Sequence, residues 1–306
     1  MREGDETPRA GESGRPELFE PVVREDVLRV RRPGTRWLST GPDGGQSRGS
    51  VAYNVSVPEG WEHTDLGAYV AERRARAGFD EPGPALFTGV DLDHLRGARA
   101  GPVEAYATAG VSNPATLPTG TEESASAEPS TPMAPDRTDV DGCPAWRRDD
   151  DRLTRWTDAG PGTVNLIVGT TRALAAGAFA NLIAVVAEAK AATLLAATGV
   201  PGTTTDAVIV GCDPDGEPAA FSGSATSVGA AARACVREAV CASLASRYAD
   251  RTLPASVAAA EHGVHTTGRA TVFRVDRRGA DRTTDDRDDR NTDDRRGRNA
   301  DDHDRS

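Results

Sequence analysis

Residues 163–211 read TVNLIVGTTRALAAGAFANLIAVVAEAKAATLLAATGVPGTTTDAVIVG, and this stretch decides the fold. A β-branched run is followed by a long apolar segment, a glycine and threonine turn, and a second β-branched run. This order predicts a strand, a helix over about residues 172–198 and a second strand, with the helix buried on the sheet. Alanine, leucine and valine occupy nearly every face of the helix, so it should be covered on more than one side.

Two charged residues, Glu188 and Lys190, interrupt the predicted helix. At roughly 100° per residue they point about 200° apart, so they cannot share one exposed stripe. At least one should therefore enter a protein-lined environment, where a charge must be paired or used. Lys190 is also the only lysine, since arginine supplies every other basic side chain of this kind. Its compact ammonium can deliver a point charge to an anion or can extend along the helix to solvent.

Outward from this unit, alternating apolar residues predict further strands and two more helices. The strands begin near Val27, Thr35, Ser50, Ala85 and Val103, and the helices cover about residues 64–77 and 228–248. Together these elements predict an α/β or α+β fold with a mixed β-sheet flanked by helices. The glycine-rich residues 41–45 form either a hairpin turn or a loop whose backbone amides approach a ligand.

One main domain over residues 18–252 is expected. Residues 1–17 are predicted to be a disordered arm, and residues at about 116–160 a disordered insertion without hydrophobic period. Residues 253–306 are predicted to be mostly disordered, ending in a repetitive Asp/Arg tail, although RATVFRV from Arg269 is a candidate edge strand.

The chain is strongly acidic, with a formal net charge of -11 and a pI near 5.0 over 306 residues. This balance argues against nucleic-acid or anionic-membrane partners. Acidic excess with a single lysine and few aromatic residues indicates adaptation to high salt. No signal-type segment begins the chain, and the apolar helix is interrupted by polar residues, so we expect a cytoplasmic protein. The sequence indicates no oligomeric state.

The sequence predicts no metal site. Asp91, Asp93 and His94 cluster after a predicted strand, but helix capping explains them at least as well as metal binding. The cysteines lack ligand spacing and are interpreted as small apolar residues of a reducing compartment: Cys143, Cys212, Cys235 and Cys241.

Several segments occur in an order that resembles a known family. They are the glycine loop at 41–45, TAGVSN at 108–113, GTVNLIV at 162–168, EAK at 188–190, GTTTDAVIV at 202–210 and SGSATSVG before the last helix. Over roughly residues 20–250 the chain resembles the adenosylcobinamide amidohydrolases of corrinoid salvage. The resemblance implies hydrolysis of the amide that links aminopropanol to the corrin ring, yielding adenosylcobyric acid and aminopropanol. The cobalt corrinoid is then the small-molecule substrate, and no cofactor is expected.

Two other functions remain compatible with the sequence. One is an amidase for a different small amide, because no corrin pocket is visible in the residues themselves. The other is a non-catalytic corrinoid-binding protein, since residues 223–228 read GSATSV where the family often has a lysine- or histidine-containing loop. If that loop held a catalytic base, this chain would need another group for the role.

Amide hydrolysis needs a nucleophile, proton transfer groups and donors for the developing oxyanion. None of the five histidines lies in the resembling motifs, so a carboxylate base with a water or hydroxyl nucleophile is expected. Glu188 in its apolar helix is the candidate acid or base. Lys190 is the candidate charge stabiliser. If catalysis is covalent, the nucleophile is Thr205 or Ser112. Asp206 either orients a threonine or a water molecule, or it caps its turn. The expected substrate contacts are Gly44, Gly45, Thr108, Gly110, Ser112, Asn113 and Asn165.

Overall fold

The computed structural model describes residues 18–58, 61, 65–117, 162–250, 253, 257, 260 and 263–275. The chain divides into two units, Met1–Thr267 and Gly268–Ser306. The predictions of disorder for residues 1–17, for most of the insertion and for the Asp/Arg tail lie outside the described residues, as does Cys143.

The first unit contains all of the described helices and strands. In chain order they are β1 (Glu20–Arg24), β2 (Val27–Ser39), β3 (Gly45–Ser56), α1 (Leu66–Arg76), β4 (Ala85–Thr88), the 3-10 turn η1 (Leu92–His94), β5 (Arg96–Ala100), β6 (Val103–Ala109), β7 (Ala115–Thr116), β8 (Val164–Leu174), α2 (Ala176–Thr198), β9 (Ala207–Ala219), α3 (Ser227–Arg247) and β10 (Val264–His265).

The described strands form a mixed eight-stranded sheet in the order β4-β3-β2-β9-β8-β6-β5, with β1 added to β2. β8 pairs with β9 in parallel and β3 with β4 in parallel, whereas the other pairs of this sheet are antiparallel. The predicted mixed sheet with flanking helices is therefore confirmed. A second, small sheet consists of β7 and β10, which pair in parallel. It brings residues that follow α3 beside the segment that follows β6.

The β8-α2-β9 unit follows the prediction from residues 163–211. Ile167 lies opposite Ile209 in the parallel register, and both are buried, as both strands carry β-branched residues suited to a covered sheet. α2 then returns the chain to the start of β9. The helix begins at Ala176 rather than near residue 172, because β8 continues to Leu174 and pairs there with the end of β9.

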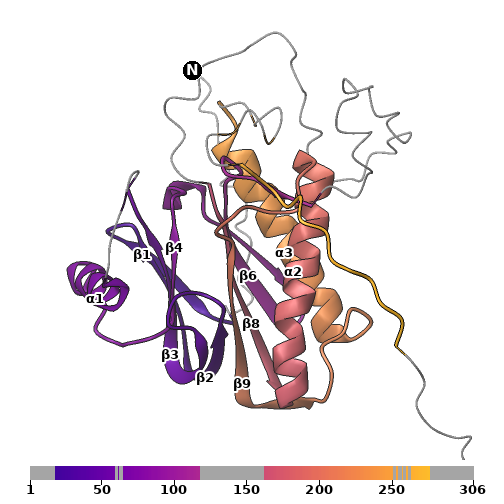
Figure 1. The fold of residues 1–306 in the computed structure, drawn as a ribbon. Helices are drawn as coiled ribbons and strands as arrows, with labels where there is room; N and C mark the ends of the chain where they lie inside the picture. The colour runs from indigo at the N-terminus through magenta and orange to yellow at the C-terminus, as the bar shows by residue number, and fades with distance from the viewer. Residues whose placement is uncertain are drawn as a thin grey trace, which may run out of the picture. The chain divides into compact units, whose positions relative to one another are not determined.

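The helices cover the sheet from two sides (Figure 1). α2 and α3 pack side by side on β5, β6, β8 and β9, and α1 lies against the N-terminal strands. The larger core lies under α2 and α3, with Leu182, Val186 and Leu244 fully buried in it. By length and composition, α2 is the described helix that could span a membrane, but its inner face is packed within this core.

β2 joins two stretches that the sequence presents as separate strands. Its pairing with β3 shifts register between Arg31 and Thr35, where Gly34 adopts φ 73°. Such an irregularity bends a strand and increases its twist. A second core, around Phe19 and Ile209, includes Val30 and Trp37 from the two sides of this bend.

The second unit departs from its prediction. Residues 269–275 form no strand, and Val272 and Phe273 are 94% and 79% exposed. Alternation of apolar residues is not sufficient for a strand, because a strand also requires a neighbour for its hydrogen bonds. The ordered pairing instead occurs earlier, at β10.

Candidate active site

The polar segments predicted from the sequence converge at one edge of the sheet. β6 is antiparallel to β8, with Ala109 opposite Val164, and β8 is parallel to β9, with Asn165 opposite Ala207. The carboxyl end of β6 therefore meets the amino ends of β8 and β9. This topology brings residues 110–113 beside the 202–206 loop.

Lys190 and Asp206 form an ion pair at this edge. Their side chains are 13% and 10% exposed, so the pair is largely protected from water. Asp206 also accepts hydrogen bonds from the Val164 N–H at 2.9 Å, from the Thr203 N–H at 3.0 Å and from the Thr203 hydroxyl. Since a carboxylate offers about four acceptor positions, these donors and Lys190 occupy all of them. Asp206 thus fixes both the loop and the ammonium.

Lys190 fulfils the expectation of a charge held inside the protein. Within the described residues its polar contact is Asp206. An ammonium has three N–H donors, so two remain for a ligand. A donor that is fixed by a second group and partly screened from water is the arrangement that stabilises a developing oxyanion.

The expectation that Glu188 lies in an apolar environment is wrong. Its side chain is 64% exposed, and its carboxylate lies 3.6 Å from Arg233 of α3. α2 buries one face on the sheet, and Lys190 lies beside that face, so a residue about 200° away points to solvent. The desolvation that suggested an acid–base role for Glu188 is therefore absent.

Asn113 ties the segment after β6 to the loop before β9. Its side chain is 4% exposed and donates to the Thr204 hydroxyl at 2.7 Å and to the Thr205 hydroxyl at 3.5 Å. In return, the Thr204 N–H donates to the Asn113 carbonyl at 3.1 Å. Thr205 itself is exposed. We call Lys190, Asp206, Asn113 and the threonines at 203–205 the strand-end cluster.

Two of the expected substrate contacts, Asn165 and Thr108, are buried beneath the strand ends. Asn165 is 1% exposed and donates to the Asn54 side chain at 3.1 Å and to the Phe87 carbonyl at 2.7 Å. Thr108 is fully buried, accepts from Asn54 at 3.0 Å and donates to Thr88 at 3.2 Å. Their polar groups are used within the protein. The network therefore supports the strand ends from inside and does not present Asn165 or Thr108 to a ligand.

Gly110 lies close to Arg247, a residue that was not predicted from the sequence to belong to the site. A Cβ atom at Gly110 would lie 2.9 Å from Nε of Arg247, the last residue of α3. A side chain at residue 110 would therefore have to displace the Arg247 side chain. Next along the chain, the Val111 N–H donates to the Tyr248 hydroxyl at 2.9 Å. In the sequence, Arg247 looks like an ordinary basic residue in the last turn of a helix.

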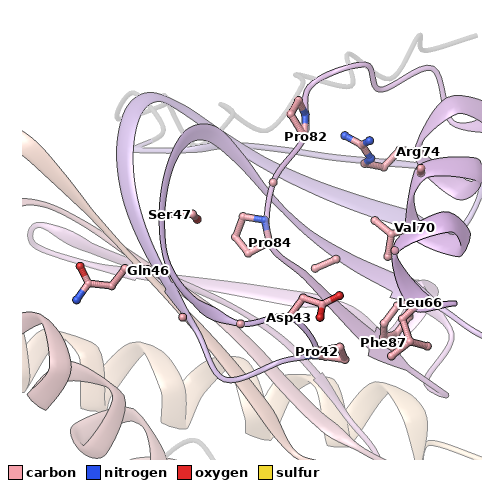
Figure 2. Close-up of a pocket in the computed structure, with 16 residues that line it drawn as sticks. Pro42, Asp43, Gln46, Ser47, Leu66, Val70, Arg74, Pro82, Pro84 and Phe87 are labelled. Carbon is pink, nitrogen blue, oxygen red and sulfur yellow. The ribbon is translucent and has the colours of Figure 1, made fainter. Parts of the chain in front are cut away.

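Gly44 and Gly45 line a cavity of about 310 Å³ between the β2–β3 hairpin, α1 and the entry to β4 (Figure 2). Asp43 and Arg74 bring opposite charges to it, and Leu66 and Phe87 supply apolar surface. Phe87 connects the cavity to the strand-end cluster, since its carbonyl accepts the hydrogen bond from Asn165. Residues 41–45 are thus both a hairpin turn and part of a cavity wall.

The GSATSV departure lies away from this cluster. Residues 223–228 follow the carboxyl end of β9, whereas Asp206 precedes its amino end, and thirteen residues of strand separate the two. Thr226 caps α3, because its hydroxyl accepts from the Gly229 N–H at 3.0 Å and donates to the Gly223 carbonyl at 2.8 Å. The loop starts a helix, and the missing basic residue does not alter the strand-end cluster.

Within the described ranges, no group of three or more histidine, cysteine, aspartate or glutamate residues could hold a metal ion. Asp91 caps η1, as expected. Cys212, Cys235 and Cys241 are buried and form no disulfide with one another. Burial raises the pKa of the Cys235 thiol to about 11, so the reactive thiolate is scarce at neutral pH.

The fold and this cluster define an α/β protein with an ion-paired lysine, an exposed threonine and backbone turns at one sheet edge. The comparisons with known proteins assign such a chain to the amidohydrolases. The family model described as adenosylcobinamide amidohydrolase matches residues 11–252, so the chain belongs to that family. It is 50% identical over 259 residues to the adenosylcobinamide amidohydrolase of Halobacterium salinarum, covering 84% of this chain and 100% of that protein. No solved structure matches the chain.

This chain is therefore an amidohydrolase that acts on an amide bond of adenosylcobinamide in corrinoid salvage. The prediction of family and function from the ordered motifs is confirmed.

Proposed function

We propose that the chain hydrolyses the aminopropanol amide of adenosylcobinamide at the strand-end cluster. The observation that carries this assignment is the Lys190 ammonium, fixed by Asp206 beside the exposed Thr205. Hydrolysis adds one water across the C–N bond. The C–N bond breaks as the water oxygen bonds to the acyl carbon, which becomes the carboxylate of adenosylcobyric acid. Both protons of the water pass to the nitrogen, which leaves as the ammonium of aminopropanol.

Each described residue of the cluster has a separate role in this proposal. Lys190 donates to the carbonyl oxygen as it gains negative charge. Asp206 positions Lys190 and the loop, because its acceptor positions are occupied. Thr205 and Asn113 orient the attacking group. Water is the nucleophile that the geometry favours, because no histidine or carboxylate among the described residues contacts the Thr205 hydroxyl to activate it.

The cavity beside the cluster takes a projecting part of the same substrate. Its volume of about 310 Å³ lies at the low end of the range for small-molecule pockets, so it suits a side arm rather than a whole corrinoid. Gly44 and Gly45 form its wall next to the start of β3. The cobalt belongs to the substrate, and the protein supplies no cofactor.

The setting of the reaction is a salty cytoplasm. The net charge of -11 and the relative from Halobacterium salinarum support this, and the same charge disfavours nucleic acid and anionic membrane as partners. A small corrinoid is the partner that the proposal requires.

The test is incubation of the purified full chain with adenosylcobinamide at high and low potassium chloride, followed by mass identification of products. We expect adenosylcobyric acid and free aminopropanol in equal amounts. Non-adenosylated cobinamide, run in parallel, measures selectivity for the upper ligand. Release of aminopropanol from neither substrate under any salt condition would overturn the proposed function.

A further inference from the structure

Arg247 is a buried cation whose charge the described part of the chain leaves unbalanced. The residue is 5% exposed, and its Nε has no hydrogen-bond partner. None of the ion pairs between described residues includes it. Among the described residues, its guanidinium carbon lies 6.0 Å from the centroid of the Tyr248 ring. A buried charge without a partner is costly, so such a group is expected to meet an anion.

The guanidinium lies at the edge of the strand-end cluster. A Cβ atom at Gly110 would lie 2.9 Å from Arg247 Nε and 3.3 Å from its Cζ. On the other side, a Cβ atom at Gly162 would lie 2.9 Å from the Gly110 carbonyl carbon and 2.5 Å from the Ser112 hydroxyl oxygen. Arg247 thus lies against Gly110, and Gly162 lies against Gly110 and Ser112. An anion at Arg247 would lie next to the segment that leads to Asn113.

The other cation of the cluster does not need an external anion. Lys190 is neutralised by Asp206, whose acceptor positions are full. The two cations therefore have different electrostatic requirements. Lys190 suits a neutral amide carbonyl that gains charge transiently, whereas Arg247 suits a group with a permanent negative charge.

We infer that Arg247 binds the carboxylate that hydrolysis creates on the corrinoid. This inference rests on the proposed function and names a binding residue for its product. A guanidinium matches a carboxylate in shape and can hold it through two parallel hydrogen bonds. The amide of the substrate is neutral, so Arg247 distinguishes acid from amide at the same corrinoid.

The test compares binding of adenosylcobyric acid and adenosylcobinamide to the wild type, Arg247→Met and a control, Arg237→Met. Arg237 lies on the same helix, but its side chain is 62% exposed and paired with Glu238. Calorimetry gives the dissociation constant for the acid directly, and for the amide it is run in Lys190→Met backgrounds, in which turnover is expected to be about 100-fold slower. Thermal unfolding of each variant is measured in parallel.

We expect Arg247→Met to weaken binding of the acid roughly 10- to 100-fold, as loss of a charged hydrogen-bond pair does, with less than a threefold change for the amide. Its Tm should not fall, because a buried cation without an internal counter-ion is removed. Arg237→Met should change neither constant.

Equal weakening of acid and amide, or no change in either, would overturn the inference. A large fall in Tm with unchanged acid binding would also overturn it, since it would indicate a counter-ion from the chain's own residues. These outcomes are separate from failure of the proposed function, which shows as absence of aminopropanol release by the wild type.

Discussion

Lys190 is the residue on which the chemistry of this site depends. It is the only lysine of the chain, and its side chain reaches Asp206 while the helix around it is apolar. An ammonium can approach a carbonyl oxygen as a compact charge with free donors, which a planar arginine cannot reproduce in the same volume. The ion pair also shows why the carboxylate of Asp206 differs from that of Glu188. One is enclosed by donors, and the other points to solvent.

Lys190→Met should lower kcat roughly 100-fold, the effect of removing one donor to an oxyanion. Glu188→Gln is the matched control, two residues away on the same helix and exposed, and should keep kcat within about threefold of the wild type. Steady-state release of aminopropanol measures both. Loss of turnover in folded Glu188→Gln would return that carboxylate to the mechanism.

The free energy of unfolding of each variant shows whether the loss of turnover comes from catalysis or from misfolding. Lys190→Met alone leaves Asp206 without its counter-charge and should cost about 3–5 kcal/mol, as removal of one partner of a buried pair does. The double variant Lys190→Met/Asp206→Asn should regain much of that loss yet stay inactive. If the double variant recovered activity together with stability, Lys190 would have only a structural role.

Asp213 joins β9 to β2 through Arg32, whose Nη2 lies 2.5 Å from the carboxylate. Partial burial raises the pKa of Asp213, but the hydrogen bonds from Arg32 and from the Asp215 N–H outweigh burial, and the net pKa lies below the ordinary value of 3.8. A lowered folded-state pKa stabilises the fold above the ordinary value. That contribution is lost as the pH falls through the folded pKa.

Asp213→Asn should therefore lower the free energy of unfolding by about 1 kcal/mol at pH 7, and the difference from the wild type should shrink below about pH 4. Urea unfolding at pH 7, 5 and 3 in constant salt measures the trend. A difference that stayed constant across this range would show that the ion pair is not its origin.

At the level of elements, α2 illustrates how one helix serves both packing and the site. Its buried face includes Leu182 and Leu194, both fully buried, while Leu195 is 50% exposed. The local sequence is apolar on both faces, so only the sheet and α3 distinguish them. The position of Lys190 beside the buried face follows from that packing.

Leu182→Ala should destabilise the protein by about 2–5 kcal/mol, because it removes buried methyl groups and leaves a cavity under the helix. Leu195→Ala, the same change on the outer face, should cost less than about 1 kcal/mol. Urea unfolding in high salt gives both values. Similar losses for the two variants would mean that the outer face of α2 is covered in solution.

For the whole molecule, the dominant physical quantity is charge. At a net charge of -11 the folded chain repels itself, and ions screen this repulsion over about 10 Å at 0.1 M salt and about 3 Å at 1 M. Self-repulsion favours the expanded chain, so screening should favour the folded state.

The Tm should therefore rise by several degrees between 0.1 M and 2 M potassium chloride. Differential scanning calorimetry on the full chain measures the change, and the same series at pH 5, where fewer carboxylates are ionised, should show a smaller rise. A Tm that is independent of salt at pH 7 would argue against adaptation to a saline cytoplasm.

The prediction from sequence succeeded where the signal is local. The β8-α2-β9 unit, the cap of η1 and the apolar character of α2 follow from residue type and spacing. It failed where distant segments decide. In the sequence, β2 looks like two separate strands, because nothing local shows that they are continuous. Their continuity depends on pairing with β3 and β9. In the sequence, Thr108 and Asn165 look like substrate contacts. Their internal hydrogen bonds to Asn54 could not be foreseen, because Asn54 lies on a strand far away in sequence.

By itself, the sequence determined the mixed sheet with flanking helices, the family through its ordered motifs, the acidic composition and the candidate status of Lys190. These depend on composition, period and order along the chain. Only the tertiary structure decided that Lys190 meets Asp206, that Glu188 faces solvent, that the GSATSV loop lies at the other end of β9, and that Arg247 reaches Gly110. The physical reason is that burial and ion pairing depend on which distant neighbours cover a side chain.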